Sequence, residues 1–155
     1  MNTKISKIGV IFASAIFTMI VLMPVPKLAL ADGDVDLIGK MRDLQYFTHK
    51  AGIAIRGENL ELADFYAHEL EELLVALEGI AEYDGFPIAE LSEAMLKPQV
   101  MNLGEGLDSG NSNTALEAYG TLIETCNACH AVTAHGYIKI IDDSERNPYA
   151  QDFSK

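Results

Sequence analysis

The chain has 155 residues, with 11 basic and 23 acidic side chains and a formal net charge of −12. This acidic balance argues against binding to DNA or RNA, because neutralising phosphates requires clustered Lys and Arg. An acidic membrane surface would also repel the chain. The hydrophobic content of 49% is raised by one N-terminal segment, so the remainder is expected to have the composition of an ordinary soluble domain.

Residues 1–31 have the pattern of an export signal. Two lysines precede an apolar run over residues 8–23, and the segment ends in Ala-Leu-Ala, which suits cleavage by a signal peptidase after Ala31. We expect a periplasmic mature chain of residues 32–155, a single domain. Cleavage removes three of the 11 basic residues, so eight remain against 23 acidic ones, a formal charge of −15. An uncleaved segment would instead be a membrane anchor.

The first two predicted elements are amphipathic helices. Residues 35–56 carry apolar or weakly apolar side chains at helical spacing: Leu37, Met41, Leu44, Thr48, Ala51 and Ile55. Gly57 should end this helix, and Asn59 can cap the next. The second helix is predicted over residues 60–83, with an apolar face of Leu62, Tyr66, Leu70, Leu73 and Leu77. Residues 84–87, Asp-Gly-Phe-Pro, then predict a turn.

A third helix is predicted over residues 88–107. Pro98 should break or kink it after Lys97, because proline removes a hydrogen bond and clashes with the preceding turn. A polar loop follows over residues 108–113. Thr114 and Glu117 match a capping box that would open the fourth helix. This helix carries Leu116, Tyr119, Leu122, Ile123, Cys126 and His130.

Four amphipathic helices with short connections predict an all-α fold, an antiparallel four-helix bundle over residues 35–134. A C-terminal extension follows over residues 135–155. In it, residues 137–141 are apolar and β-branched and are expected to be extended, whereas residues 142–155 form a polar tail.

The only two cysteines lie in Cys126-Asn127-Ala128-Cys129-His130. An exported protein with two cysteines usually forms a structural disulfide, but a bridge across two residues closes too small a loop to constrain the chain much. A thioredoxin-like redox pair normally belongs to a βαβ pattern, which is missing from this sequence. A zinc site would need more ligands, and His135 is the only nearby candidate.

Covalent attachment of haem c accounts for the whole motif. Thiols three residues apart lie about 60° from each other around a helix, so both can reach the vinyl groups of one porphyrin. His130 lies about 40° from Cys126 on the same face, where its imidazole can reach the iron. We therefore expect one covalent haem c on Cys126 and Cys129, with His130 as the proximal axial iron ligand.

The order of these features resembles the class II cytochromes c, the cytochrome c-prime type of four-helix bundle. The resemblance covers about residues 35–134, and the haem motif near the C-terminus is its specific part. It implies attachment through Cys126 and Cys129 and iron ligation by His130. It also implies electron transfer when the iron is six-coordinate, and binding of nitric oxide or carbon monoxide when it is five-coordinate. Such bundles often form homodimers through their first two helices. The extension after residue 134 departs from the family pattern.

The resemblance directs the search for a sixth ligand to the first helix. His49 is the first candidate, because it shares a face with Gly52, a residue small enough for a porphyrin to approach. Its alternatives are a surface imidazole or a partner for a haem propionate. Met41 is the second candidate, although core packing would equally explain it. A vacant position is the third possibility.

The remaining candidates have weaker signals. We expect His68 on the surface, His135 near the haem edge without binding iron, and Met95 and Met101 in the core. Four cations could pair with haem propionates: Arg42, Lys50, Arg56 and Lys97. Glutamates 69, 71 and 72 should form a solvated face that could also steer a positively charged redox partner.

These features predict an exported monohaem electron carrier whose iron cycles between Fe(II) and Fe(III). A five-coordinate gas-binding protein is the alternative, and a haem-free helical adaptor is a third. The sequence has no nucleophile with its base and no phosphate-binding loop, so we do not expect an enzyme; any catalysis would belong to the haem. The expected partners are redox proteins with a basic docking patch and a possible second copy of the chain.

Overall fold

A computed structural model describes residues 36–155. The predicted export signal over residues 1–31 lies outside the described residues, as does its cleavage site. Within residues 36–155, no helix has both the length and the apolar character needed to cross a membrane.

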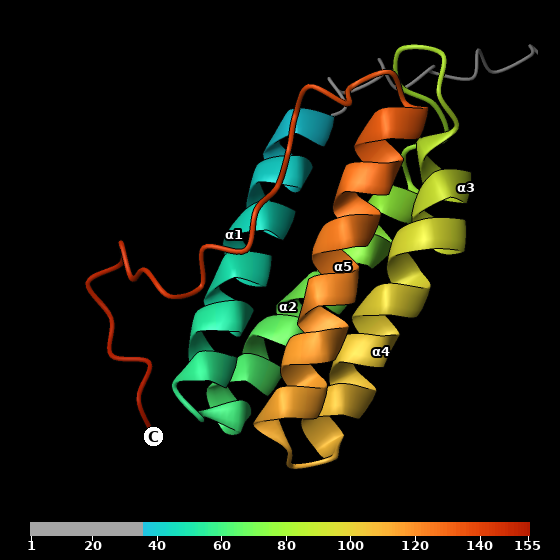
Figure 1. Cartoon of the computed structure of the whole chain (residues 1–155). Coiled ribbons are helices and arrows are strands. Elements are labelled where there is room, and N and C mark those ends of the chain that lie inside the picture. The colour runs from blue at the N-terminus through green and yellow to red at the C-terminus, as the bar shows by residue number, and fades with distance from the viewer. Residues whose placement is uncertain (1–35) are drawn as a thin grey trace, which may run out of the picture. The chain divides into compact units, whose positions relative to one another are not determined.

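The described chain is all-α, as predicted, with four helical columns packed against antiparallel neighbours (Figure 1). The first two columns are α1 (Leu37–Arg56) and α2 (Leu60–Glu78). The third consists of α3 (Ile88–Leu91), the π-helical segment η1 (Ser92–Leu96) and α4 (Lys97–Asp108). The fourth is α5 (Ser112–Val132). Helix α1 packs on α2 and α5, and α4 packs on α5 and α2.

Side chains and glycines define the ends of the first two helices. The Asp36 side chain caps α1 by accepting from the Gly39 amide, and the Asn59 side chain caps α2 by accepting from Leu62, as the sequence predicted. Helix α2 ends at Glu78 and not at residue 83. Residues 83–86 form a tight turn instead, in which the Tyr83 and Phe86 backbones exchange two hydrogen bonds.

The third column continues through Pro98, so the predicted break after Lys97 is wrong, but the regular α-helix is interrupted just before the proline. The helix widens into η1 just before the proline, and the Lys97 amide donates to the carbonyl of Ser92, five residues earlier. This wider turn moves the preceding carbonyls away from the proline ring, which would clash with them in a regular α-helix. Pro98 then occupies the first turn of α4, where a missing N–H is tolerated.

Helix α5 begins before the predicted capping box. Its N-cap is Asn111, whose side-chain oxygen accepts from the amides of Asn113 and Thr114. Thr114 is therefore already helical. The polar run contains several residues that can cap a helix, and Asn111 is the one that satisfies two free amides.

The C-terminal extension lies along α1 (Figure 1). Residues 50–55 of α1 are all buried, although a helix packed on one side buries only a stripe. The extension covers the other side: Gln151 accepts a hydrogen bond from Lys50, and the Phe153 side chain is buried. The segment expected to be extended, residues 137–141, forms no strand in the described part of the chain.

Gly52 faces Tyr119 and not a free space for a porphyrin. A Cβ atom built on Gly52 would lie 2.5 Å from Cζ of the Tyr119 ring. Tyr119 is fully buried, and its hydroxyl has no hydrogen-bond partner among the described residues. The glycine is therefore explained by the close approach of α1 and α5.

Candidate functional site

The motif occupies the last turns of α5. Cys126, Cys129 and His130 are all partly buried, and neither cysteine forms a disulfide. Burial raises the pKa of the Cys126 thiol to about 11 and also raises the pKa of Cys129. Reactive redox cysteines have lowered thiol pKa values, so this environment is the opposite of the one that activates a thioredoxin-like pair.

Both cysteines and His130 line an apolar cavity of about 360 Å³. Helices α1, α2 and α5, the third column, the turn after α2 and the extension all contribute to its wall. The lining outside the motif is mostly apolar and includes Met41, Leu44, Leu70, Leu74, Phe86, Ile88, Leu96, Val100, Leu122 and Ile140. A cavity of this size and character is typical of a site for an apolar small molecule or cofactor.

The His130 imidazole is oriented by the extension. Its Nδ1 lies 3.0 Å from the backbone carbonyl oxygen of Ile138. A carbonyl only accepts hydrogen bonds, so Nδ1 carries the proton and Nε2 keeps its lone pair. Metal-binding histidines are commonly held in this way, with the other ring nitrogen donating to a backbone carbonyl or a carboxylate.

The chain reverses direction directly after α5, which is how Ile138 comes back to His130. Ala134 has a φ of +61°, a left-handed conformation found at many helix ends. The His135 amide then donates to the carbonyl of His130 at 2.7 Å. Further along, Asn127 binds both backbone groups of Ile140.

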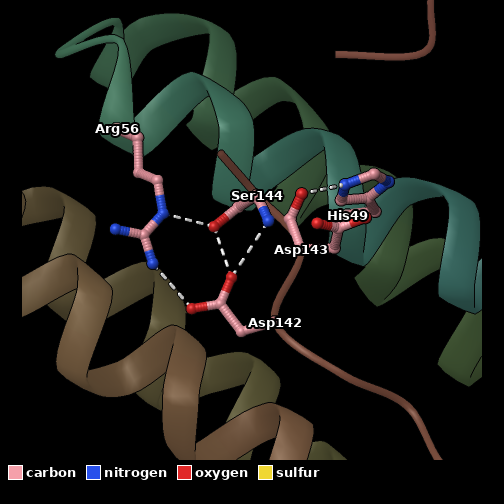
Figure 2. A network of polar contacts seen from close by, with 5 residues as sticks. All are labelled: His49, Arg56, Asp142, Asp143 and Ser144. Carbon is pink, nitrogen blue, oxygen red and sulfur yellow. Dashed lines mark hydrogen bonds and ion pairs between the residues drawn. The ribbon is translucent and has the colours of Figure 1, made fainter. Parts of the chain in front are cut away.

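The structure does not bring His49 to the cavity that holds the motif. The two ring nitrogens of His49 lie 3.1 Å from the Tyr149 hydroxyl and 3.0 Å from the Asp143 carbonyl oxygen (Figure 2 shows the latter). Its imidazole thus fastens the extension to α1. Met41, the second candidate, does line the cavity with Cys126.

Of the four candidate cations, Arg42 alone lines this cavity. Lys50 donates to Gln151, and its Nζ lies 4.6–5.2 Å from the ring centroids of Tyr46, Tyr66 and Tyr149. Lys97 pairs with Glu93.

Arg56 is also engaged elsewhere, in the polar network of Figure 2. It donates to Ser144 and pairs with Asp142 at 2.6 Å. Ser144 in turn donates to Asp142 through both its amide and its hydroxyl. This network holds the extension against the C-terminal end of α1.

The remaining predicted residues are two histidines and two methionines. His68 is on the surface near Glu71 and Glu72, and His135 lines the cavity beside the motif. Met95 is partly buried. Met101 is 54% exposed, so its predicted place in the core is wrong; the buried face of α4 is formed by Val100, Leu103, Gly106 and Leu107.

Sequence reasoning missed Asn127 and the Ile138 carbonyl. Asn127 stands between the cysteines, where the motif accepts any residue, and a backbone carbonyl leaves no signal in a sequence. Between residues 36 and 155, no group of three or more His, Cys, Asp or Glu side chains is arranged to hold a metal ion.

Comparisons with protein-family models, with curated proteins and with solved structures gave no match for this chain. The fold and the cavity therefore carry the functional argument.

The residues around the cavity fit a haem. Two thiols and an imidazole whose Nε2 is free share one wall, and the remaining lining is mostly apolar, as a porphyrin requires. Arg42 adds a cation that could pair with a propionate.

Proposed function

We propose that this chain is an exported monohaem c-type cytochrome that carries electrons. The observation that supports this most directly is the shared cavity: Cys126, Cys129 and His130 line one apolar space, and the His130 tautomer leaves Nε2 available to iron. Haem bound there would supply a one-electron Fe(III)/Fe(II) couple. The resemblance to class II cytochromes c agrees with this assignment.

In the proposed protein each residue has a separate task. The two cysteines hold the porphyrin through thioether bonds, and His130 binds the iron. The surrounding aliphatic wall excludes water, which lowers the cost of reorganising solvent when the charge of the iron changes. Met41 would supply the second iron ligand, because it is the candidate of α1 that lines the cavity. A thioether ligand raises the reduction potential.

Pyridine haemochrome spectra test the proposal. The protein, produced by export together with a haem-maturation system, should give a c-type band. Replacing both cysteines (Cys126→Ser with Cys129→Ser) should abolish covalent haem. His130→Ala should retain the thioether bonds and change the axial spectrum, whereas the surface variant His68→Ala should match the wild type. Wild-type protein without a c-type band would overturn the proposal.

A five-coordinate gas-binding protein is the second candidate, favoured by the apolar lining of the cavity. Carbon monoxide separates the two functions. If Met41 closes the iron, the ferrous spectrum should change little with carbon monoxide, and Met41→Leu, which conserves volume, should make the protein responsive. Met101→Leu on the exposed side of α4 is the matched control. A strong response of the wild type would instead support gas binding.

The proposed electron transfer also requires a redox partner. The acidic side chains on the outer face of α2 (Glu61, Asp64, Glu71, Glu72 and Glu78) are exposed. We propose that they steer a redox protein with a basic patch to the bundle. A second copy of the chain and a periplasmic location remain parts of the same proposal.

A further inference from the structure

Asn127 makes a two-way contact with the C-terminal extension. Its Nδ2 donates to the Ile140 carbonyl at 2.8 Å, and its Oδ1 accepts from the Ile140 amide at 2.8 Å. One side chain thus satisfies both backbone groups of one residue. This pairing fixes the position and the register of the extension on α5.

The fixed residue lies two positions from the carbonyl that orients the axial imidazole. Ile138 accepts from His130 Nδ1 through its carbonyl and donates its own amide to the His135 carbonyl at 2.8 Å. The segment from residue 135 to residue 140 is therefore held at both ends, by the turn after α5 on one side and by Asn127 on the other.

Packing alone does not hold this segment. The side chains of Tyr137 and Ile138 are 78% and 43% exposed, and Lys139 is also exposed. Within the segment only its two end residues, His135 and Ile140, are partly buried. The hydrogen bonds between Ile140 and Asn127 therefore restrain the Ile138 carbonyl from its C-terminal side.

We infer that Asn127 is a positioning residue for the haem iron. By holding Ile140 it keeps the Ile138 carbonyl on His130 Nδ1, and so fixes the tautomer, the orientation and the basicity of the axial imidazole. This inference rests on the proposed function. A hydrogen bond from Nδ1 makes the imidazole a stronger donor to iron, which favours the ferric state. Loss of Asn127 should therefore raise the midpoint potential.

Potentiometry of the haem-loaded full chain tests the inference, with Asn127→Ala as the main variant. We expect a midpoint potential above the wild-type value and faster hydrogen exchange of the Ile140 amide, at unchanged haem content. The matched control is Ala128→Asn, which changes the other intervening residue of the motif, an exposed one. It should leave both quantities at the wild-type values. If Asn127 were purely structural, Asn127→Ala would lower the free energy of unfolding without changing the midpoint potential.

A second variant approaches the same pair from the other side. Ile140→Pro removes the amide that Asn127 accepts from, and should also raise the potential. In the double variant the shifts should add less than fully, because both changes remove the hydrogen bond from the Ile140 amide to Asn127 Oδ1. If Asn127→Ala does not fold, the midpoint potential of Ile140→Pro alone tests the inference. An unchanged potential with a normal c-type band overturns the inference and leaves the cytochrome assignment standing, whereas a missing band in the wild type overturns the assignment itself.

Discussion

At the scale of single residues, His49 and Asn127 show how function-related contacts escape a sequence reading. His49 had the spacing of a ligand on the apolar side of α1, yet its partners Tyr149 and Asp143 lie about 100 residues away in the chain. A local sequence pattern does not predict a contact between residues so far apart in the chain. By contrast, Cys126, Cys129 and His130 lie within five consecutive residues, so their shared helix face followed from helical geometry alone.

Gly52 gives a direct test of the packing between α1 and α5. Gly52→Ala should lower the free energy of unfolding by about 1–3 kcal/mol, because the new methyl group would overlap the rigid, buried Tyr119 ring. Gly104→Ala is the control, since a Cβ there meets nothing within 4 Å. It should stabilise the protein by about 0.5–1 kcal/mol through helix propensity. Urea unfolding measures both, and a neutral or stabilising Gly52→Ala would contradict this packing.

At the scale of elements, local signals predicted four helices but not all of their ends. Asn59 was predicted correctly because it is the one strong cap between Gly57 and the next apolar run. The start of α5 was misplaced because residues 108–114 offer several caps, and the choice among them depends on where the loop leaves α4. The π-helical turn before Pro98 was missed because a helix can accommodate a proline by a break, a kink or a wider turn, and the sequence does not distinguish these.

The cap of α5 distinguishes the observed start from the predicted one. Asn111→Ala should cost about 1 kcal/mol of stability, because the amides of residues 113 and 114 lose their acceptor. Thr114→Ala, which removes the first residue of the predicted capping box, should cost clearly less. Equilibrium denaturation in urea compares them; the reverse order of the two losses would show that the helix starts at Thr114.

The stabilising contact between the extension and α1 at Asp142 should weaken at low pH. Burial alone would raise the pKa of the Asp142 carboxyl, but hydrogen bonds from Ser144 and pairing with Arg56 outweigh burial and hold this pKa below its usual value of 3.8. The unfolded chain therefore binds the proton more tightly than the folded protein. The contribution of Asp142 to stability is complete above the unfolded pKa and is lost as pH falls through the folded one.

The variant Asp142→Asn tests the predicted direction of this pH dependence. We expect the variant to be slightly less stable than the wild type near neutral pH, with a small effect because the pair is partly exposed. The difference in unfolding free energy should shrink below about pH 4. Asp64→Asn, an exposed change on α2, should show no comparable trend. A difference that grows in acid would refute the assigned pKa direction.

At the scale of the whole molecule, the negative charge predicts how a partner arrives: it is −12 for the full chain, and −15 (eight basic against 23 acidic residues) without the predicted export signal. The rate constant for electron exchange with a cationic redox protein should fall by about tenfold or more as ionic strength rises from low to physiological values. Glu71→Lys with Glu72→Lys should reduce both the rate and its salt dependence more than Glu105→Lys with Asp108→Lys, which changes the total charge equally. Stopped-flow kinetics would measure this; equal effects of both pairs would remove α2 from the proposed docking face.

The central claim is that a porphyrin is bonded to Cys126 and Cys129. Intact-mass spectrometry of the exported protein, denatured and treated with a thiol-alkylating reagent, tests it most directly. The account predicts the mass of the chain plus one haem, with no alkylated cysteine. A chain mass without haem, in which both sulfurs are alkylated or joined in a disulfide, would contradict it.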